Sequence, residues 1–230
     1  MIYKLLNYLL FPKFCLNCKL PGAYLCKNCF NSQLQPKQQQ CFFCKQHSFF
    51  GLTCFKCQKD LRPKLVYSLF RYNDLTSKVI REIKFRSAHK VLSEFLDLTK
   101  ANYQKDLMQF YQLLPKNIIV DCIPLHPKRL KERGFNQAEL IYDNLFKPFG
   151  LKQKQLLIRT KYSDPQSFMS SKLKRFYNVK NAFQIKEKKL PPHILLIDDI
   201  ITSGHTMLSA CNTLIKNGAK TVFFFALISR

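Results

Sequence analysis

The stretch ILLIDDIITSGHT, residues 194–206, decides the fold of this chain. Its four leading apolar residues predict a buried strand over residues 194–197, and two adjacent carboxylates arrive at the end of that strand. The small and hydroxyl-bearing residues that follow lead into a predicted helix over residues 206–216. A buried strand that turns directly into a helix is the building unit of a parallel α/β sheet.

Apolar runs on both sides of this stretch extend the predicted sheet. Three more strands are predicted over residues 66–71, 118–123 and 221–228. Further helices are predicted over residues 74–85, 88–99 and 135–146. Asn73 or Asp74 is the predicted N-cap of the first of these, and Gly218 is the predicted left-handed residue before the last strand. Continuously apolar strands that alternate with helices predict an α/β fold with a parallel sheet covered on both faces.

The composition excludes two classes of protein. Apolar residues make up 47% of the 230 residues, which excludes a wholly disordered chain. The longest apolar runs, such as residues 221–228, fall far short of the ~20 residues that a bilayer-spanning helix needs, so no membrane span is predicted. A formal net charge of +24 predicts a polyanionic partner, with lysine enrichment for solubility as the alternative.

The first residues predict a helix. Residues 1–11 (MIYKLLNYLLF) repeat large apolar side chains at spacings of three and four, which places them on one face. A signal peptide is the alternative, but Asn7 and Tyr8 interrupt the apolar run. Pro12, Lys13 and a cysteine follow, where small residues would precede a cleavage site. Export is therefore not expected.

Eight of the ten cysteines form four Cys-x-x-Cys pairs. Each pair can present two thiolates to one tetrahedral ion, so four pairs predict two closed Cys₄ zinc sites of structural type. Redox dithiols and disulfides are the alternatives, and disulfides would require export. The metal prediction places the protein in the cytoplasm. The predicted ligands are Cys15, Cys18, Cys26, Cys29, Cys41, Cys44, Cys54 and Cys57.

The short spacers between pairs favour sequential pairing of neighbours, as in a zinc ribbon, while a cross-braced arrangement stays open. His47 lies inside one spacer and is either a substitute ligand or an exposed loop residue. The lone Cys122 and Cys211 are predicted to be small buried apolar residues. Residues 32–40 form a polar connector between the two ribbons. Two domains follow: residues 1–60 as helix and double zinc ribbon, and residues 61–230 as the α/β domain.

Residues after the predicted strand 194–197 have the chemistry of a sugar-phosphate site. Ligands of parallel sheets bind beyond the carboxyl ends of strands. The turn formed by Thr202, Ser203, Gly204, His205 and Thr206 offers backbone N–H groups and hydroxyls to an anion at a helix N-terminus. Asp198 and Asp199 can accept hydrogen bonds from ribose hydroxyls. The alternative is that the two carboxylates only stabilise the helix terminus.

This stretch resembles the ribose-5-phosphate loop of type I phosphoribosyltransferases, enzymes that bind phosphoribosyl pyrophosphate (PRPP) with Mg²⁺. The block PLHPKRLKERGFNQA, residues 124–138, closely resembles the signature of the competence protein F (ComF) family. So does a spaced pattern of residues in the following segment. That pattern comprises Arg159, Gln166, Arg175, Asn178, Val179, Ala182 and Phe183. With the cysteine pairs in front, the resemblance covers essentially the whole chain.

The resemblance implies a phosphoribosyltransferase-like domain and roles for its residues. Asp198 and Asp199 would orient the ribose while residues 202–206 hold its phosphate. The basic residues after the strand 118–123 would face the pyrophosphate, or else form a solvated basic turn. These residues are Lys128, Arg129 and Arg133. His205 departs from the Ala or Lys that relatives often carry, although its backbone amide can still serve.

Residues 152–189 hold eleven Lys or Arg against two acidic residues, with aromatic residues interleaved. Such a segment suits single-stranded nucleic acid, because cations track phosphates while rings stack on unpaired bases. A lysine-rich flap over the site is the alternative. The sequence therefore predicts a ComF-like protein that binds PRPP or a nucleotide, acts in single-stranded DNA uptake for transformation and contacts DNA-uptake proteins. The alternative function is an active phosphoribosyltransferase that transfers ribose phosphate to a nucleobase or amine.

Overall fold

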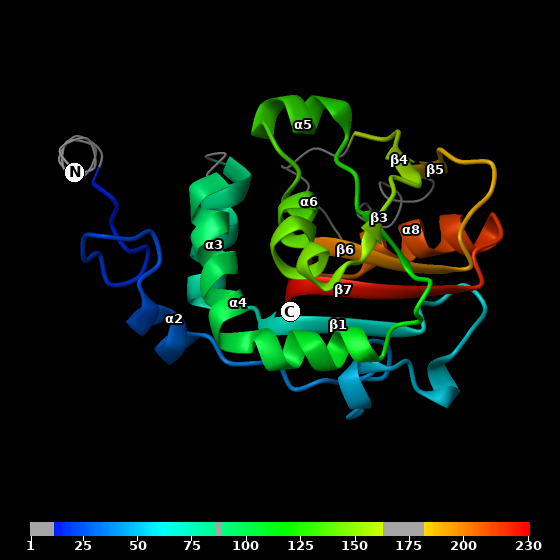
Figure 1. Ribbon diagram of the computed structural model, residues 1–230, viewed down its shortest axis with the longest axis horizontal. Coiled ribbons are helices and arrows are strands. Elements are labelled where there is room, and N and C mark those ends of the chain that lie inside the picture. The colour runs from blue at the N-terminus through cyan, green and yellow to red at the C-terminus, as the bar shows by residue number, and fades with distance from the viewer. Residues whose placement is uncertain (1–11, 86–88, 163–181) are drawn as a thin grey trace.

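The computed structural model describes residues 12–85, 89–162 and 182–230. Its centre is a five-stranded sheet of order β1-β7-β6-β2-β3, in which every neighbouring pair is parallel. The strands are β1 (Leu65–Arg71), β2 (Ile119–Cys122), β3 (Lys152–Gln153), β6 (His193–Ile201) and β7 (Thr221–Ser229). The prediction of an α/β fold with a parallel sheet is confirmed (Figure 1).

Helices and a small hairpin cover the two faces of this sheet (Figure 1). One face packs on α3 (Asp74–Phe85), α4 (His89–Gln112), α6 (Gln137–Ile141) and the π-helix η3 (Tyr142–Phe146). The other packs on α8 (His205–Lys216) and the antiparallel hairpin of β4 (Leu157–Arg159) and β5 (Phe183–Ile185). The remaining elements are α2 (Lys27–Gln33), η1 (Phe49–Gly51), η2 (Phe55–Cys57), α5 (Pro127–Arg133) and η4 (Lys147–Phe149).

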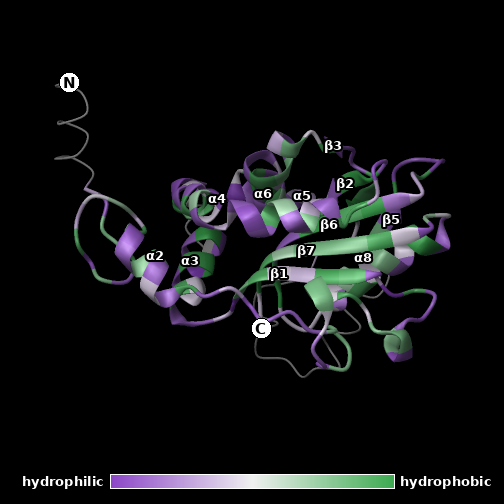
Figure 2. Ribbon diagram, turned by 60° about the horizontal axis from the view of Figure 1, so that its bottom comes forward, coloured by the Kyte–Doolittle hydropathy of each residue, from purple (hydrophilic) through white to green (hydrophobic). Residues whose placement is uncertain are grey.

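The hydropathy of the strands matches their place in the sheet. Strand β7 is largely apolar along its length, as Figure 2 shows in green, and β6 is apolar over residues 194–197. Eight of the nine residues of β7 are buried, because helices or the hairpin cover both of its faces. This is the burial that a continuously apolar run predicts for a central parallel strand.

Strand β6 is longer than predicted. It was expected to end at residue 197, with the two carboxylates beyond it, but it continues to Ile201. Its pairing with β2 ends at Cys122↔Ile197, whereas its pairing with β7 continues through Asp198↔Ala226 to Ile201↔Ser229. The carboxylates therefore lie within β6, on a stretch that is hydrogen-bonded on one side only.

Two helices differ from their predicted ranges, and a third forms where a loop was expected. Helix α4 continues to Gln112, with a break in helical geometry at Tyr103 (φ −121°, ψ 24°). The helix predicted over residues 135–146 starts at Gln137, capped by Asn136, whose Oδ1 accepts from Ala138 N at 3.1 Å, and it becomes a π-helix from Tyr142. The basic loop expected after β2 is largely helical, since Pro127 at its first position favours a helix start.

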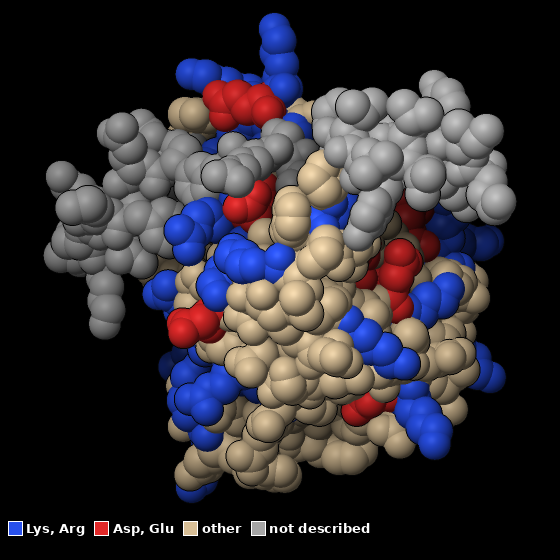
Figure 3. All heavy atoms as spheres, turned by 90° about the vertical axis from the view of Figure 1, so that its left-hand side faces the viewer, with Lys and Arg blue, Asp and Glu red and all other residues tan. Residues whose placement is uncertain are grey.

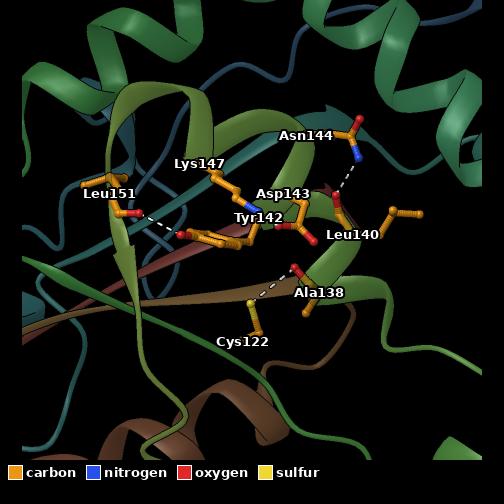
Figure 4. Close-up of polar contacts among 8 residues, drawn as sticks. All are labelled: Cys122, Ala138, Leu140, Tyr142, Asp143, Asn144, Lys147 and Leu151. Atoms are coloured by element: carbon orange, nitrogen blue, oxygen red, sulfur yellow. Dashed lines mark hydrogen bonds and ion pairs between the residues drawn. The ribbon is translucent and has the colours of Figure 1, made fainter.

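Short polar contacts attach α6 and η3 to the end of the sheet (Figure 4). The Cys122 thiol donates to the Ala138 carbonyl at 3.3 Å, and the Tyr142 hydroxyl donates to the Leu151 carbonyl at 2.7 Å. Cys122 is 3% exposed and Cys211 is fully buried. Both lone cysteines are therefore buried core residues, as predicted.

Some predictions fall on residues outside the described ranges, namely the helix over residues 1–11 and the middle of the basic segment, residues 163–181. The division at residue 60 stays a prediction, since buried side chains from both sides of it, such as Phe30 and Phe70, pack in one core. Among the described helices, none has the length and apolar character required to cross a membrane.

Candidate functional site

The eight paired cysteines form two groups of four. Cluster 1 holds Cys15, Cys18, Cys26 and Cys29, and cluster 2 holds Cys41, Cys44, Cys54 and Cys57, with the sulfur atoms of each group within 4.8 Å of one another. The sulfurs of Cys18 and Cys26 lie 3.7 Å apart, and those of Cys44 and Cys54 lie 3.6 Å apart. A tetrahedral zinc ion with bonds of about 2.3 Å requires sulfurs about 3.8 Å apart, so both groups fit zinc.

Neighbouring pairs share a cluster, which confirms the sequential arrangement, and exposed His47 belongs to neither. The first knuckle of each cluster folds the same way. Lys19 and Lys45 each follow their knuckle with φ 64°, and each donates its backbone N–H to the carbonyl of the first cysteine, at 3.0 Å and 2.9 Å. The two modules thus repeat one turn at their first knuckle.

Each cluster contains one acidic thiol. Burial raises the pKa of Cys15, but the backbone N–H groups of Cys26, Cys18 and Asn17 outweigh burial and lower this pKa to about 6. Cys41 has a pKa of about 6 for the same reason, with N–H groups of Cys44, Cys54 and Phe43 around its sulfur. Backbone donors that favour a thiolate are the usual environment of a zinc-binding cysteine.

Cluster 1 is joined to the helical face of the sheet. Glu94 of α4 accepts from Lys13 Nζ at 2.5 Å and from Tyr24 N at 2.7 Å, on either side of the first knuckle. Phe30 of α2 is fully buried and meets Phe70 and Phe95 edge-on at 5.9 Å and 5.8 Å between ring centroids. Cluster 1 and helix α2 therefore contribute side chains to the main hydrophobic core.

The loop after β6 forms a pocket with the first carboxylate. This pocket is lined by Asp198, by the loop residues Thr202, Ser203, Gly204, His205 and Thr206, and by Ile200, Ile201, Met207 and Phe224. Gly204 has φ 77° and precedes α8, whose first-turn N–H groups lack helical acceptors. The Ser203 hydroxyl lies 3.2 Å from His205 Nδ1. The predicted phosphate-loop residues thus surround one hollow at a helix N-terminus.

Basic residues from three separate elements surround the two carboxylates. Lys84 of α3 lies 3.8 Å from Asp199, and both side chains are mostly buried. Burial lowers the pKa of Arg133 in α5 and of Arg159 in β4. The carboxylates act in the opposite direction, Asp199 and Asp198 on Arg133 and Asp198 on Arg159, so both guanidinium groups lie within electrostatic reach of them. The end of β6 is therefore a site of mixed charge, assembled from segments far apart in the sequence.

The carboxyl of Asp198 resists ionisation. Burial raises its pKa well above the usual range, the charge of Asp199 raises it further, and Lys84 acts in the opposite direction. Asp199 N donates to Asp198 Oδ1 at 2.9 Å, which fixes the direction of that side chain. Two adjacent carboxyls held this way are able to share a proton, a cation or the hydroxyl groups of a ligand.

The other predicted basic residues lie farther along the same edge. Lys128 and Arg129 of α5 lie over the Tyr162 ring, at 4.8 Å and 5.8 Å from its centroid. Tyr162 follows β4, so the hairpin and α5 meet here. Of the three predicted pyrophosphate-facing residues, Arg133 interacts electrostatically with both carboxylates.

Sequence reasoning missed two contributors to this site. Lys84 stands in an ordinary amphipathic helix, and only the fold brings it to Asp199. Asp121 stands in the apolar run of β2 and is fully buried, with Oδ2 accepting from Leu157 N at 3.0 Å and Oδ1 without a hydrogen-bond partner among the described residues. Asp121 attaches β4, and with it Arg159, to the sheet. The sequence signal that could have identified Asp121 is its position as an acidic residue inside the apolar run of residues 118–123.

Replacing Asp121 by asparagine is expected to remove a pH dependence of stability. Burial raises the pKa of this carboxyl from 3.8 to about 8, although the Leu157 and Leu156 N–H groups lower it. The stability that the protonated form contributes is present below about pH 4 and is lost as the pH rises towards about 8. Denaturant titrations at several pH values should therefore show a larger fall in unfolding free energy for the unchanged protein than for Asp121→Asn. Equal falls would contradict this assignment.

Basic side chains are spread over the face that carries α2 and α3 rather than gathered in one stripe, and acidic side chains lie between them (Figure 3). On this face the positive charge is therefore distributed, not concentrated. A distributed charge attracts polyanions over a distance without specifying how they bind.

Curated relatives cover nearly the whole chain, whereas no protein-family model matches it. The DNA utilization protein YhgH of Escherichia coli O157:H7 is 28% identical over 224 residues, which are 94% of this chain and 96% of that protein. Competence protein F of Haemophilus influenzae is 28% identical, covering 93% of this chain and 95% of the relative. Competence protein ComFC of Bacillus subtilis is 27% identical, covering 90% and 85%. With both cysteine clusters assembled as well, the resemblance of this chain to the competence protein F family is confirmed.

Proposed function

We propose that the chain binds a ribose phosphate of the PRPP class, with Mg²⁺, in the pocket at the end of β6, and that it acts on single-stranded DNA during uptake for transformation. One observation carries the first part: Asp198 and the whole turn of residues 202–206 line the same pocket. Carboxylates beside an anion-binding turn match a ligand that carries both hydroxyl groups and a phosphate.

Each side chain has a definite task in this proposal. The N–H groups at the start of α8 and the hydroxyls of Thr202, Ser203 and Thr206 would hold the phosphate. Asp198 and Asp199 would accept hydrogen bonds from the ribose hydroxyls, and Lys84 would stay paired with Asp199. Binding at this site would relieve the mutual repulsion of the two carboxyls, because the ligand hydroxyls donate to them.

The pyrophosphate of PRPP would lie towards α5. The charge of Arg133 in α5 couples to both carboxylates, and Lys128 and Arg129 of the same helix lie at the Tyr162 ring. Mg²⁺ would supply the divalent charge that neutralises the pyrophosphate oxygens. Guanidinium groups suit this position, because their forked donors match phosphate oxygens.

The DNA part of the proposal is supported by the names of the relatives and by charge. Those relatives are named for competence and for DNA utilization. The described ends of the basic segment, residues 152–162 and 182–189, carry most of its lysines, and Tyr162 and Phe183 stand among them. Phosphate contacts by these lysines would make single-stranded DNA binding strongly dependent on salt.

Replacing both carboxylates with amides is expected to weaken PRPP binding by at least about 100-fold, since two charge-assisted hydrogen bonds are worth roughly 1.5–3 kcal/mol each. The measurement is calorimetric titration of the zinc-loaded protein with PRPP and Mg²⁺, for the unchanged protein and for Asp198→Asn with Asp199→Asn. The matched control is Asp143→Asn, which removes an exposed carboxylate that pairs with Lys147 at the surface. Absence of heat with the unchanged protein, or equal affinity of both variants, would refute the ribose-phosphate site.

Two further titrations separate the remaining functions. Addition of single-stranded DNA to the same cell at two salt concentrations tests the DNA part, and binding that is absent at low salt would refute it. Release of pyrophosphate from PRPP with a panel of nucleobases and amines tests the alternative of an active transferase. That alternative is favoured by the complete turn of residues 202–206 and is retired if no acceptor supports turnover.

A further inference from the structure

The segment that carries cluster 2, residues 41–57, contacts both faces of the sheet at its edge strand β1. It runs below β1 in Figure 1. Leu52 pairs with Leu65 in an isolated bridge, and Thr53 N donates to the Lys64 carbonyl at 2.9 Å. Phe50 stacks on Tyr67 at 5.6 Å between centroids, on the helical face of the sheet. This half of the module is therefore fastened to β1.

The knuckle of the same module reaches the opposite face. Phe42 lies between the cluster ligands Cys41 and Cys44, and its ring packs against the core that contains Ile201 and Met207. Those two residues flank the turn of residues 202–206, so a metal-binding knuckle touches the wall of the proposed phosphate pocket.

The contact with the turn itself is close. A Cβ atom built on Gly204 would overlap Phe42 Cζ and lie 2.8 Å from Phe42 Cε1. The ring thus lies directly on the backbone of Gly204, the N-cap residue that precedes α8 and has φ 77°. Glycine leaves room for this approach, because any side chain at position 204 would overlap the ring.

The ring is held in place from its own side as well. Phe43 meets Phe42 edge-on at 5.4 Å, and Lys45 Nζ lies 4.4 Å from the centre of the Phe42 ring. Lys45 is also the left-handed residue that closes the knuckle, with φ 64°. The position of the ring therefore depends on the shape of the knuckle, and that shape depends on the thiolates of Cys41 and Cys44 being held together.

We propose that Phe42 is a positioning residue, through which zinc in cluster 2 holds the turn of residues 202–206 in its ligand-binding shape. Affinity for the ligand then depends on metal occupancy of cluster 2 and not of cluster 1. This inference rests on the proposed ribose-phosphate site. Leu16 stands at the matching place in cluster 1, but it packs against the core on the helical face of the sheet, away from the turn.

The first test replaces the ring. Phe42→Ala is expected to keep two zinc ions per chain, to raise amide hydrogen exchange of residues 202–206 by about tenfold or more, and to weaken PRPP binding by about tenfold. Phe55→Ala is the matched control: Phe55 follows the first cysteine of the other knuckle of cluster 2 and is 93% exposed. Exchange and affinity within twofold of this control would overturn the proposal.

The second test removes one metal at a time. Cys44→Ser and Cys18→Ser each remove an exposed ligand at the same place in their own cluster. Loss of the cluster 2 ion should raise exchange in residues 202–206 and abolish the effect of Phe42→Ala, because the ring has already lost its support. Loss of the cluster 1 ion should change neither the amide hydrogen exchange of residues 202–206 nor the effect of Phe42→Ala. Equal effects of the two serine variants on the turn would overturn the proposal.

Exchange is measured without ligand, so it separates this inference from the proposed function. If the unchanged protein does not bind PRPP, the ribose-phosphate site fails, and exchange alone decides whether Phe42 and cluster 2 hold the turn. If PRPP binds, but neither Phe42→Ala nor loss of the cluster 2 ion changes amide hydrogen exchange of the turn, the ribose-phosphate site stands. The proposed coupling of cluster 2 to the turn is then refuted.

Discussion

Removal of zinc by a strong chelator is expected to lower the thermal unfolding midpoint by about 10 °C or more. Structural zinc contributes roughly 10–16 kcal/mol in isolated zinc-binding peptides. A domain of this size shifts its midpoint by about 2–4 °C for each kcal/mol lost. Even partial loss of the metal contribution is therefore large beside the 5–15 kcal/mol that stabilises a typical protein.

The reason lies in how the modules join the core. In cluster 1, Cys26 is the N-cap of α2, where its sulfur accepts from Cys29 N at 3.4 Å. That helix carries the buried Phe30 between Phe70 and Phe95. Loss of zinc from cluster 1 would free the N-terminus of α2, and Phe30 would then lose its position in the core.

Calorimetric scans with and without chelator, together with metal analysis, measure the effect. Cys211→Ala is the control, because Cys211 is buried in α8 and lies in neither cluster, so it should retain two zinc ions per chain. A chelated, metal-free protein that unfolds within about 2 °C of the zinc form would show that the clusters do not support the fold.

Gly51→Ala is expected to cost about 2–5 kcal/mol, from left-handed backbone strain and from overlap. Gly51 has φ 76°, and a Cβ atom there would overlap the Val66 carbonyl oxygen and lie 3.0 Å from the carbonyl carbon. Both are backbone atoms of the buried strand β1, so neither side can yield without moving the sheet or the module. The free energy of unfolding from denaturant titration measures the loss.

Gly22→Ala separates overlap from strain. Gly22 also has a positive φ, 119°, but a Cβ atom there would meet nothing within 4 Å. Its substitution should therefore cost about 1–2 kcal/mol from strain alone. If the two substitutions lower the free energy of unfolding equally, the close approach of Gly51 to β1 does not contribute to stability.

The order of strands and helices in the α/β domain could be predicted because it depends on local apolar patterns. The runs of β6 and β7 are apolar enough to require burial on both faces, and the structure places both in the middle of the sheet. The four Cys-x-x-Cys pairs predicted two metal clusters, because the chemistry of a Cys₄ site requires only short spacers and thiolates.

The ends of elements could not be predicted, because they depend on partners distant in sequence. Strand β6 continues past residue 197 because β7 pairs with it as far as Ser229. The π-helix at Tyr142 follows from packing of α6 and from the hydrogen bond of Tyr142 to Leu151, neither of which is visible in a local pattern.

The candidate site was predictable only where one motif held its residues. Asp198 and the turn of residues 202–206 are contiguous, so the pocket they share was expected from the stretch that contains them. Lys84 and Phe42 reach the same place from more than a hundred positions away in the sequence. Lys84 stands in no distinctive pattern, and the Cys-x-x-Cys pair around Phe42 indicates a metal site, not a contact with the turn. Their roles come from the topology, which no spacing rule encodes.

The bridges across β1 also bear on how copies of this protein meet one another. A parallel sheet leaves hydrogen-bonding groups unpaired along each outer strand, and such strands readily recruit a second chain. Here Pro36↔Phe70 and Leu52↔Leu65 occupy β1, while β3 at the other border has two residues, both exposed and one of them a lysine. The β1 border is thus partly covered and the β3 border is too short, so neither edge of the sheet favours pairing with a strand of a second copy.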